Sequence, residues 1–319
     1  MPRHQPHAST PLRSPAPRRR EVAIILTLAI FFPPVTSLAQ GPAATSMRPT
    51  HRDLVFAATD GHELKLDLYL PSNRNESSRP PLLVWIHGGG WRGGSKSNCP
   101  LRGFASEGWA VASISYRFSD VAIFPAQLHE CKAAIRWLRA HADQYGYDPD
   151  HIVASGGSAG GTLALLLGVV QGDMELEGKL GDHLDRSSEV QAVINYFGPS
   201  DFVLRAKTQA DIAYTEKVGS FAWLGGLKYG HVDRRLEKLA SSTEHVTADS
   251  PPLLVFHGTD DRLVLMDQAE RIVDVYREHG LDAKLIRVDG GAHGGAKFFT
   301  PENLQHALDF LTRTVPRKN

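Results

Sequence analysis

The segment HIVASGGSAGGTLALLLGVV, residues 151–170, decides how this chain folds. It passes from an apolar run at 152–154, through glycines around Ser158, into the small and apolar residues 159–170. This order predicts a buried strand, a sharp turn and a buried helix. Residues 156–160 fit the pattern G-x-S-x-G, in which a serine is exposed on a strand-to-helix turn. Ser158 is therefore a candidate nucleophile.

The glycines beside Ser158 suit a nucleophile for a steric reason. A strained backbone at the serine brings neighbouring residues close together, so bulky Cβ substituents are disfavoured. A glycine-rich turn with a solvated serine is the alternative interpretation, because G-x-S-x-G also occurs by chance. The pattern is not a dinucleotide fingerprint, since its third position is Ser158 rather than glycine.

Short apolar runs alternate with helical patterns along most of the chain. Strand patterns occur at 64–70, 82–86, 110–114, 152–154, 190–197, 253–256 and 283–288. Helical patterns occur at 125–142, 159–170, 267–278 and 301–314. Buried strands separated by helices predict an α/β fold, with a mostly parallel sheet covered on both faces.

Two polar stretches, 171–188 and 202–249, interrupt this alternation. The second is long for a connection between regular elements. It is interpreted either as a cap over a pocket or as a surface insertion with its own small apolar cluster.

A second glycine-rich loop, HGGGW at 87–91, follows the expected strand at 82–86. Backbone N–H groups in such a loop can converge on one point and stabilise an oxygen that becomes negative. We expect the N–H groups of Gly89, Gly90 and Ala159 to bind such an oxyanion.

Two other interpretations of this loop are less favoured. A phosphate-binding loop needs lysine where this chain has Ser95. His87 precedes the nucleophile in the chain, so we expect it to brace the loop rather than to act as a base.

An activated serine needs an imidazole base, and the imidazole needs a carboxylate that fixes its tautomer. In this class of sheet the chain order is serine, acid, histidine. Of 15 histidines, only His293 lies in a loop after the last expected strand, with glycines on both sides. Asp260 and Asp261 both follow the strand at 253–256, and Asp261 is preferred because Asp260 lies in the turn itself. Asp289 is a poorer rival, since it adjoins the histidine loop.

The amino-acid composition argues against some classes of binding partner. The 35 Lys and Arg residues balance 35 Asp and Glu, which gives no basic excess for nucleic acid. Two cysteines cannot build a four-thiolate zinc site, and we expect no metal and no organic cofactor. Cys99 and Cys131 form two open alternatives. They are bonded to each other in a disulfide, or Cys131 is a buried thiol, since it lies on an apolar helical stripe.

Residues 1–39 have the pattern of a secretory signal peptide. Three arginines at 18–20 precede an apolar run at 22–32, and small residues lead to a cleavage site after Ala39. A membrane anchor is the alternative, but a span needs about 20 apolar residues, and here Pro33 ends the run. We expect a protein exported to the periplasm or secreted, with no membrane attachment after cleavage.

With these motifs in place, the chain resembles the α/β-hydrolase fold. It is most similar to the esterase branch that shares the His-Gly-Gly-Gly oxyanion loop with hormone-sensitive-lipase-type enzymes, and to exported bacterial feruloyl- and acetyl-esterases. Further shared motifs are YR at 116–117, FPAQ at 124–127, CKAAIRWL at 131–138, DPD at 148–150, FGP at 197–199 and HGG at 293–295. The resemblance implies an eight-stranded sheet in one domain, residues 40–319, with 202–249 as its insertion.

The resemblance also implies a function. It implies a serine carboxylic-ester hydrolase in which Ser158, Asp261 and His293 form the triad and an acyl-enzyme is the intermediate. The expected substrate is a small-molecule or glycan ester with a short or aromatic acyl group, such as an ester on a plant polysaccharide. An amide hydrolase of arylformamidase or peptidase type, and an inactive binding protein with this fold, are the alternatives. Two departures from the usual pattern are Gly157 before the nucleophile and Ala292 before the histidine.

Overall fold

The computed structural model describes residues 1, 47–72, 79–213, 215 and 219–315. Apart from Met1, the signal peptide expected at 1–39 lies outside these residues. Within the described part, none of the helices combines the length and the apolar character that a membrane crossing requires.

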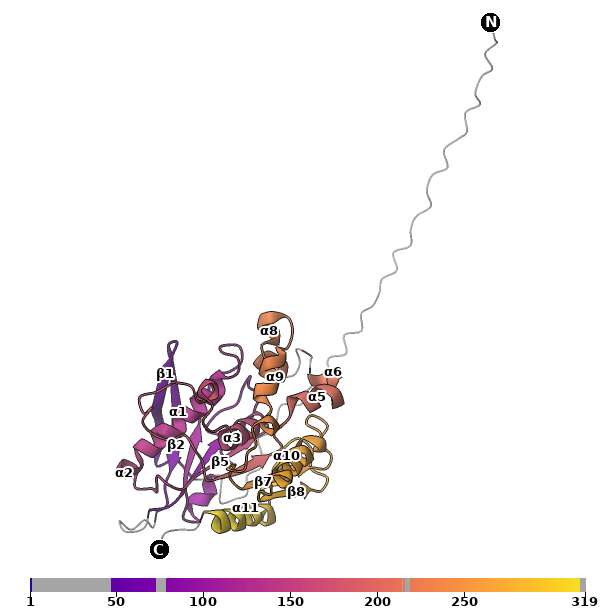
Figure 1. Cartoon of the computed structure of the whole chain (residues 1–319). Helices are drawn as coiled ribbons and strands as arrows, with labels where there is room; N and C mark the ends of the chain where they lie inside the picture. Colours follow the sequence, from indigo (N-terminus) through magenta and orange to yellow (C-terminus); the bar gives the residue numbers. More distant parts are fainter. Residues whose placement is uncertain (2–46, 73–78, 214, 216–218, 316–319) are drawn as a thin grey trace, which may run out of the picture. The chain divides into compact units, whose positions relative to one another are not determined.

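The described residues form a sheet of eight strands in the order β1-β2-β4-β3-β5-β6-β7-β8 (Figure 1). The strands are β1 (His51–Thr59), β2 (His62–Tyr69), β3 (Leu82–Ile86), β4 (Ala110–Ile114), β5 (Ile152–Gly157), β6 (Ala192–Tyr196), β7 (Leu253–Gly258) and β8 (Ala283–Val288). β2 pairs antiparallel with β1 and β4, and every other neighbouring pair is parallel. The expected α/β fold with a mostly parallel sheet of eight strands is confirmed.

Strand β1 is the one that the apolar pattern did not indicate. Its pairing with β2 shifts register twice, between His51 and Leu54 and between Val55 and Ala57. Asp53, at the first shift, has a φ of 57°. A strand at the sheet edge with such irregularities loses the strict alternation of buried and exposed residues that marks a strand in sequence.

Helices cover both faces of the sheet, as expected. Helices α1 (Ala126–Ala140), α3 (Ala159–Val169) and α10 (Met266–Glu278) pack on one face, and η1 (Arg102–Ala105) and α11 (Pro301–Thr314) pack on the other. The shorter helices α2 (Ala142–Tyr145), α4 (Met174–Glu177) and η3 (Ala296–Phe299) lie in connections. Strand β3 shows why the sheet is apolar throughout: Leu82, Val84 and Ile86 enter the first core, and Leu83 and Trp85 enter the second.

The two cysteines are both free and buried. Cys99 belongs to the core beneath α11, whereas Cys131 belongs to the core beneath α1 on the opposite face. The disulfide interpretation is therefore wrong, and the buried-thiol interpretation of Cys131 is confirmed.

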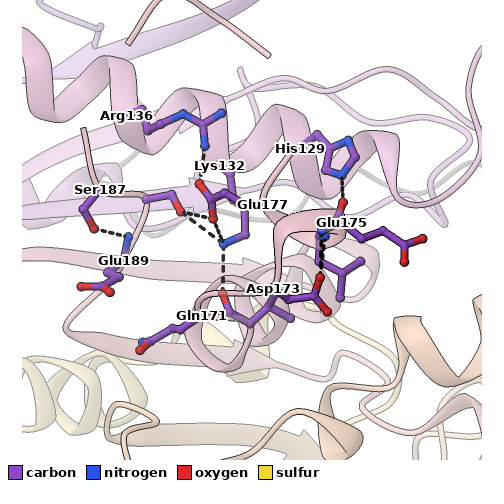
Figure 2. A network of polar contacts seen from close by, with 12 residues as sticks. His129, Lys132, Arg136, Gln171, Asp173, Glu175, Glu177, Ser187 and Glu189 are labelled. Atoms are coloured by element: carbon purple, nitrogen blue, oxygen red, sulfur yellow. Dashed lines mark hydrogen bonds and ion pairs between the residues drawn. The ribbon is translucent and has the colours of Figure 1, made fainter. Parts of the chain in front are cut away.

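An ion network of two buried cations and a partly exposed carboxylate fastens the polar stretch 171–188 to α1, as Figure 2 shows. Lys132 Nζ donates to Glu177 Oε2 at 2.7 Å and to Ser188 Oγ at 3.2 Å. Arg136 donates to the other carboxylate oxygen of Glu177. This polar connection is thus held on the molecule by charge pairing as well as by the buried side chain of Leu176.

The second polar stretch, 202–249, is largely helical. It contains α5 (Phe202–Thr208), α6 (Ala210–Ala213), α7 (Gly219–Trp223), α8 (Gly226–Tyr229), α9 (Arg234–Ala240) and η2 (Ser242–Glu244). We call this stretch the insertion. In the chain it lies between β6 and β7, and Figure 1 shows its helices α5, α6, α8 and α9 in salmon to orange.

Candidate active site

Ser158 lies on the sharp turn between β5 and α3, with φ 52° and ψ −120°. Such a conformation is strained for a residue with a side chain, and strain of this kind is concentrated at functional sites. The flanking glycines are required by contact: a Cβ on Gly156 would lie 2.2 Å from Gly160 O, and one on Gly160 would lie 2.1 Å from Ile86 O. The turn therefore needs glycine at both positions.

Ser158, His293 and Asp261 are brought together in one hydrogen-bonded series. Ser158 Oγ lies 2.8 Å from His293 Nε2, and His293 Nδ1 lies 2.7 Å from Asp261 Oδ2. The three side chains come from loops after β5, β8 and β7, at the carboxyl ends of parallel strands. With Asp261 ionised, Nδ1 must carry the proton, so Nε2 is free to accept from the Ser158 hydroxyl.

The environment of Asp261 keeps it ionised. Its buried Oδ1 accepts from the N–H groups of Leu263 and Val264, each at 2.9 Å. Burial alone would raise the pKa of Asp261, but the hydrogen bond and charge of His293, with the N–H of Val264 and the charge of His257, lower it below its usual value.

The two rival carboxylates are placed differently. Asp260 and Asp289 are exposed, and neither is hydrogen-bonded to His293 in the described contacts. The preference for Asp261 thus agrees with the geometry.

An aromatic side chain orients the histidine ring. Phe197 packs edge-to-face with His293 at a centroid distance of 5.1 Å, and Phe298 supports Phe197 at 4.6 Å. Phe197 has a φ of 44°, which is unusual for a bulky residue. It belongs to the FGP motif, but its contact with His293 could not be predicted from that motif.

The HGGGW loop packs directly against the nucleophile. A Cβ on Gly88 would lie 3.2 Å from Ser158 Cβ and 2.7 Å from Gly157 O. Gly89 and Gly90 have φ values of 121° and 61°, which favour glycine. The backbone can approach the serine this closely only without side chains.

The N–H of Ser158 does not serve as an oxyanion donor, because it donates to Tyr196 O at 2.8 Å. The next N–H along the chain is that of Ala159, the first residue of α3. A helix N-terminus favours negative charge, so Ala159 suits the oxyanion role expected of it.

His87 braces the loop, as expected. Its Nδ1 donates to Gly88 O at 2.8 Å, and its ring stacks on Tyr116 at 4.4 Å. Tyr116 also donates from its hydroxyl to His87 O at 2.9 Å. Burial lowers the pKa of His87 to about 4, so the ring stays neutral near pH 7.

The insertion contacts the HGGGW loop, which the sequence did not predict. Trp223 of α7 stacks on Trp91 at a centroid distance of 4.1 Å, and a Cβ on Gly219 would lie 1.7 Å from Gly90 O. Trp223 Nε1 also donates to Gln127 Oε1 at 2.9 Å. The insertion is therefore packed on the loop beside the nucleophile.

The two departures from the usual pattern leave the reactive groups in place. A Cβ on Gly157 would meet Phe197 and Trp85 at 3.4 Å, so glycine leaves a gap between these rings. Ala292 is exposed. Within the described residues, no group of three or more His, Cys, Asp or Glu side chains could hold a metal ion.

The sheet, the strained Ser158 turn and the Ser158–His293–Asp261 series together define an α/β-hydrolase of the serine hydrolase class. Residues 66–275 match the family model BD-FAE, and the chain belongs to this family.

Known relatives agree with this assignment. The chain is 30% identical over 256 residues to Esterase LipC of Mycobacterium tuberculosis, a match that covers 77% of this chain and 60% of LipC. The chain thus spans about three fifths of the length of that relative. A truncated carbohydrate esterase from gut microbiota has a similar structure, with a TM-score of 0.71 and 29% identity, over 83% of this chain and 95% of that one.

A thermophilic esterase, Est2 of Thermogutta terrifontis, is also similar. Its propionate-bound structure has a TM-score of 0.68 and 26% identity, over 87% of this chain and 97% of that one. The same esterase is known phosphorylated by paraoxon.

Proposed function

We propose that this protein hydrolyses carboxylic esters through an acyl-enzyme on Ser158. The observation that carries the proposal is the hydrogen-bonded series from Ser158 Oγ through His293 to Asp261. The esterase names of the relatives support the same activity.

In the proposed reaction, Ser158 Oγ attacks the ester carbonyl while His293 Nε2 takes its proton. Asp261 stabilises the imidazolium that forms. The N–H groups of Gly89, Gly90 and Ala159 bind the oxygen that becomes negative. His293 then gives the proton to the leaving alcohol, and a water molecule activated by the same histidine releases the acid.

We further propose short or aromatic acyl groups, carried by a small molecule or by a glycan such as a plant polysaccharide. The glycan part is supported by the resemblance to a carbohydrate esterase, and the short acyl part by the propionate bound to a similar esterase.

A substrate panel tests both parts of the proposal. Purified protein is assayed with p-nitrophenyl esters of increasing acyl length, with methyl ferulate, and with acetylated and feruloylated glycans. We expect kcat/KM to fall as the acyl chain lengthens and free acid to appear from at least one glycan. Turnover of anilide analogues in preference to all the esters would contradict the proposal.

Export is proposed on the pattern of residues 1–39 alone. Intact mass spectrometry of protein from the native host tests it. We expect a chain that begins at Gln40, and a mass that includes the apolar run 22–32 would contradict export with cleavage.

A further inference from the structure

The turn that carries Asp261 is held by side chains from the insertion. Arg205 of α5 donates from Nη2 to Leu263 O at 3.0 Å. Gln209, at the end of α5, reaches Leu263 O and Arg262 O, each at 3.4 Å. The backbone just after Asp261 is thus contacted by two side chains that the insertion supplies.

The start of α5 is itself fixed to α10. Gln268 Oε1, which is buried, accepts from the N–H groups of Ser200 and Asp201 at 3.1 and 2.9 Å. Ser200 Oγ in turn donates to Gln268 O at 2.6 Å. Arg205 therefore reaches the turn from an anchored helix.

Arg205 is a buried cation, with 2% of its surface exposed. Burial lowers the pKa of Arg205 to about 10, against the opposing effect of the Asp261 and Asp267 carboxylates, so the group stays charged at neutral pH. Asp261 also faces His293 and His257.

We propose that Arg205 is a positioning residue for the acid: its hydrogen bond to Leu263 O holds the turn that places Asp261 against His293. The inference rests on the proposed ester hydrolysis. The same turn supplies the N–H groups of Leu263 and Val264 that donate to Asp261 Oδ1, so loss of the Arg205 contact loosens the carboxylate and, through it, the histidine.

Two variants test this role. Arg205→Gln removes the contact with Leu263, and Arg205→Lys keeps a cation but loses the planar fork of donors. Arg277→Gln is the matched control, because Arg277 on α10 is exposed and pairs only on the surface with Asp274, at 3.2 Å.

Two measurements are made on each variant. The first is kcat and KM for p-nitrophenyl acetate. The second is the position and width of the downfield proton resonance of His293 Nδ1–H, which reports its hydrogen bond to Asp261 and needs no turnover.

Both Arg205 variants should lower kcat about tenfold with little change in KM, because the acid turn loses its support. In both variants the downfield His293 resonance should broaden or move upfield, because the Asp261–His293 hydrogen bond is held less firmly. Arg277→Gln should match the unsubstituted protein in both measurements.

A wild-type kcat and an unchanged His293 resonance in folded Arg205→Gln, or equal changes in Arg277→Gln, would overturn the proposal. If Arg205→Gln does not fold, Arg205→Lys and Gln209→Leu test the holding role, and a wild-type kcat in both would contradict it. Absence of ester turnover in the unsubstituted chain would instead count against the proposed function, and the His293 resonance would still decide the role of Arg205.

Discussion

The indole rings of Trp91 and Trp223 stack almost in parallel, with centroids 4.1 Å apart and planes 3° apart. Trp91 ends the HGGGW loop with a φ of 56°, an unfavourable value for a bulky side chain. Trp223 lies in the insertion and is fully buried. The stack therefore stabilises a strained residue of the loop that we propose binds the oxyanion.

Replacing Trp223 with leucine should lower kcat about tenfold with a smaller effect on KM, because the oxyanion donors lose part of their alignment. Steady-state kinetics on p-nitrophenyl acetate, paired with a thermal melt, checks this. Phe221→Leu is the control, since Phe221 is also buried in the insertion but packs against Gly226. If both variants lose stability while kcat stays at the wild-type value, the stack has only a structural role.

Asp261→Asn should cost far more activity than Asp260→Asn. Asn at 261 can no longer hold the His293 tautomer that leaves Nε2 free, and this change costs about 10⁴ in kcat in a comparable triad. Asp260 is exposed, so its substitution should change kcat less than about threefold. Comparable losses in the two variants would contradict the assignment of the acid.

Glu177→Gln should destabilise the fold by about 3 kcal/mol, because it leaves the buried Lys132 and Arg136 without their carboxylate. Urea unfolding at pH 7 measures the change. Glu175→Gln is the control: the Glu175–Arg235 pair is exposed and should contribute less than about 1 kcal/mol. A loss no greater for Glu177 than for Glu175 would show that the network in Figure 2 does not stabilise the fold.

The contribution of Glu177 should also depend on pH. Burial alone would raise the pKa of Glu177, but the hydrogen bond and charge of Lys132, with Ser188 and Arg136, lower it below the usual 4.5. A carboxyl with a lowered pKa stabilises the fold fully above its unfolded pKa and loses that effect as pH falls through the folded value. The difference in unfolding free energy between wild type and Glu177→Gln should therefore shrink below about pH 4.5. A difference that stays constant down to pH 3 would contradict this.

The sequence predicted those parts of the fold and site that local chemistry determines. The buried strands and the helix after Ser158 follow from apolar runs and glycines, and His293 follows from chain order. The edge strand β1 could not be predicted in this way, because its register shifts disturb the alternation of buried and exposed residues that reveals a strand. Whether Cys99 and Cys131 are bonded could not be predicted from their spacing, and the structure places the two thiols on opposite faces of the sheet.

A different reason explains why the residues that pack around the site could not be predicted. Arg205 and Trp223 lie in a polar stretch with no motif, and each acts on a segment that is distant in sequence. Gln127 lies inside a motif, yet its hydrogen bond to Trp223 depends on how the insertion folds back. Contacts of this kind are set by tertiary packing, which a single sequence does not reveal.

The most direct test of the central claim is ester turnover by Ser158→Ala, measured together with its thermal melt and its reaction with paraoxon. The substitution removes one oxygen at a surface-accessible turn, so the melting temperature should change little. Activity should fall by about six powers of ten, as in a comparable triad, and the variant should not be phosphorylated by paraoxon. Substantial turnover by a folded Ser158→Ala protein would mean that another residue is the nucleophile and would contradict the account.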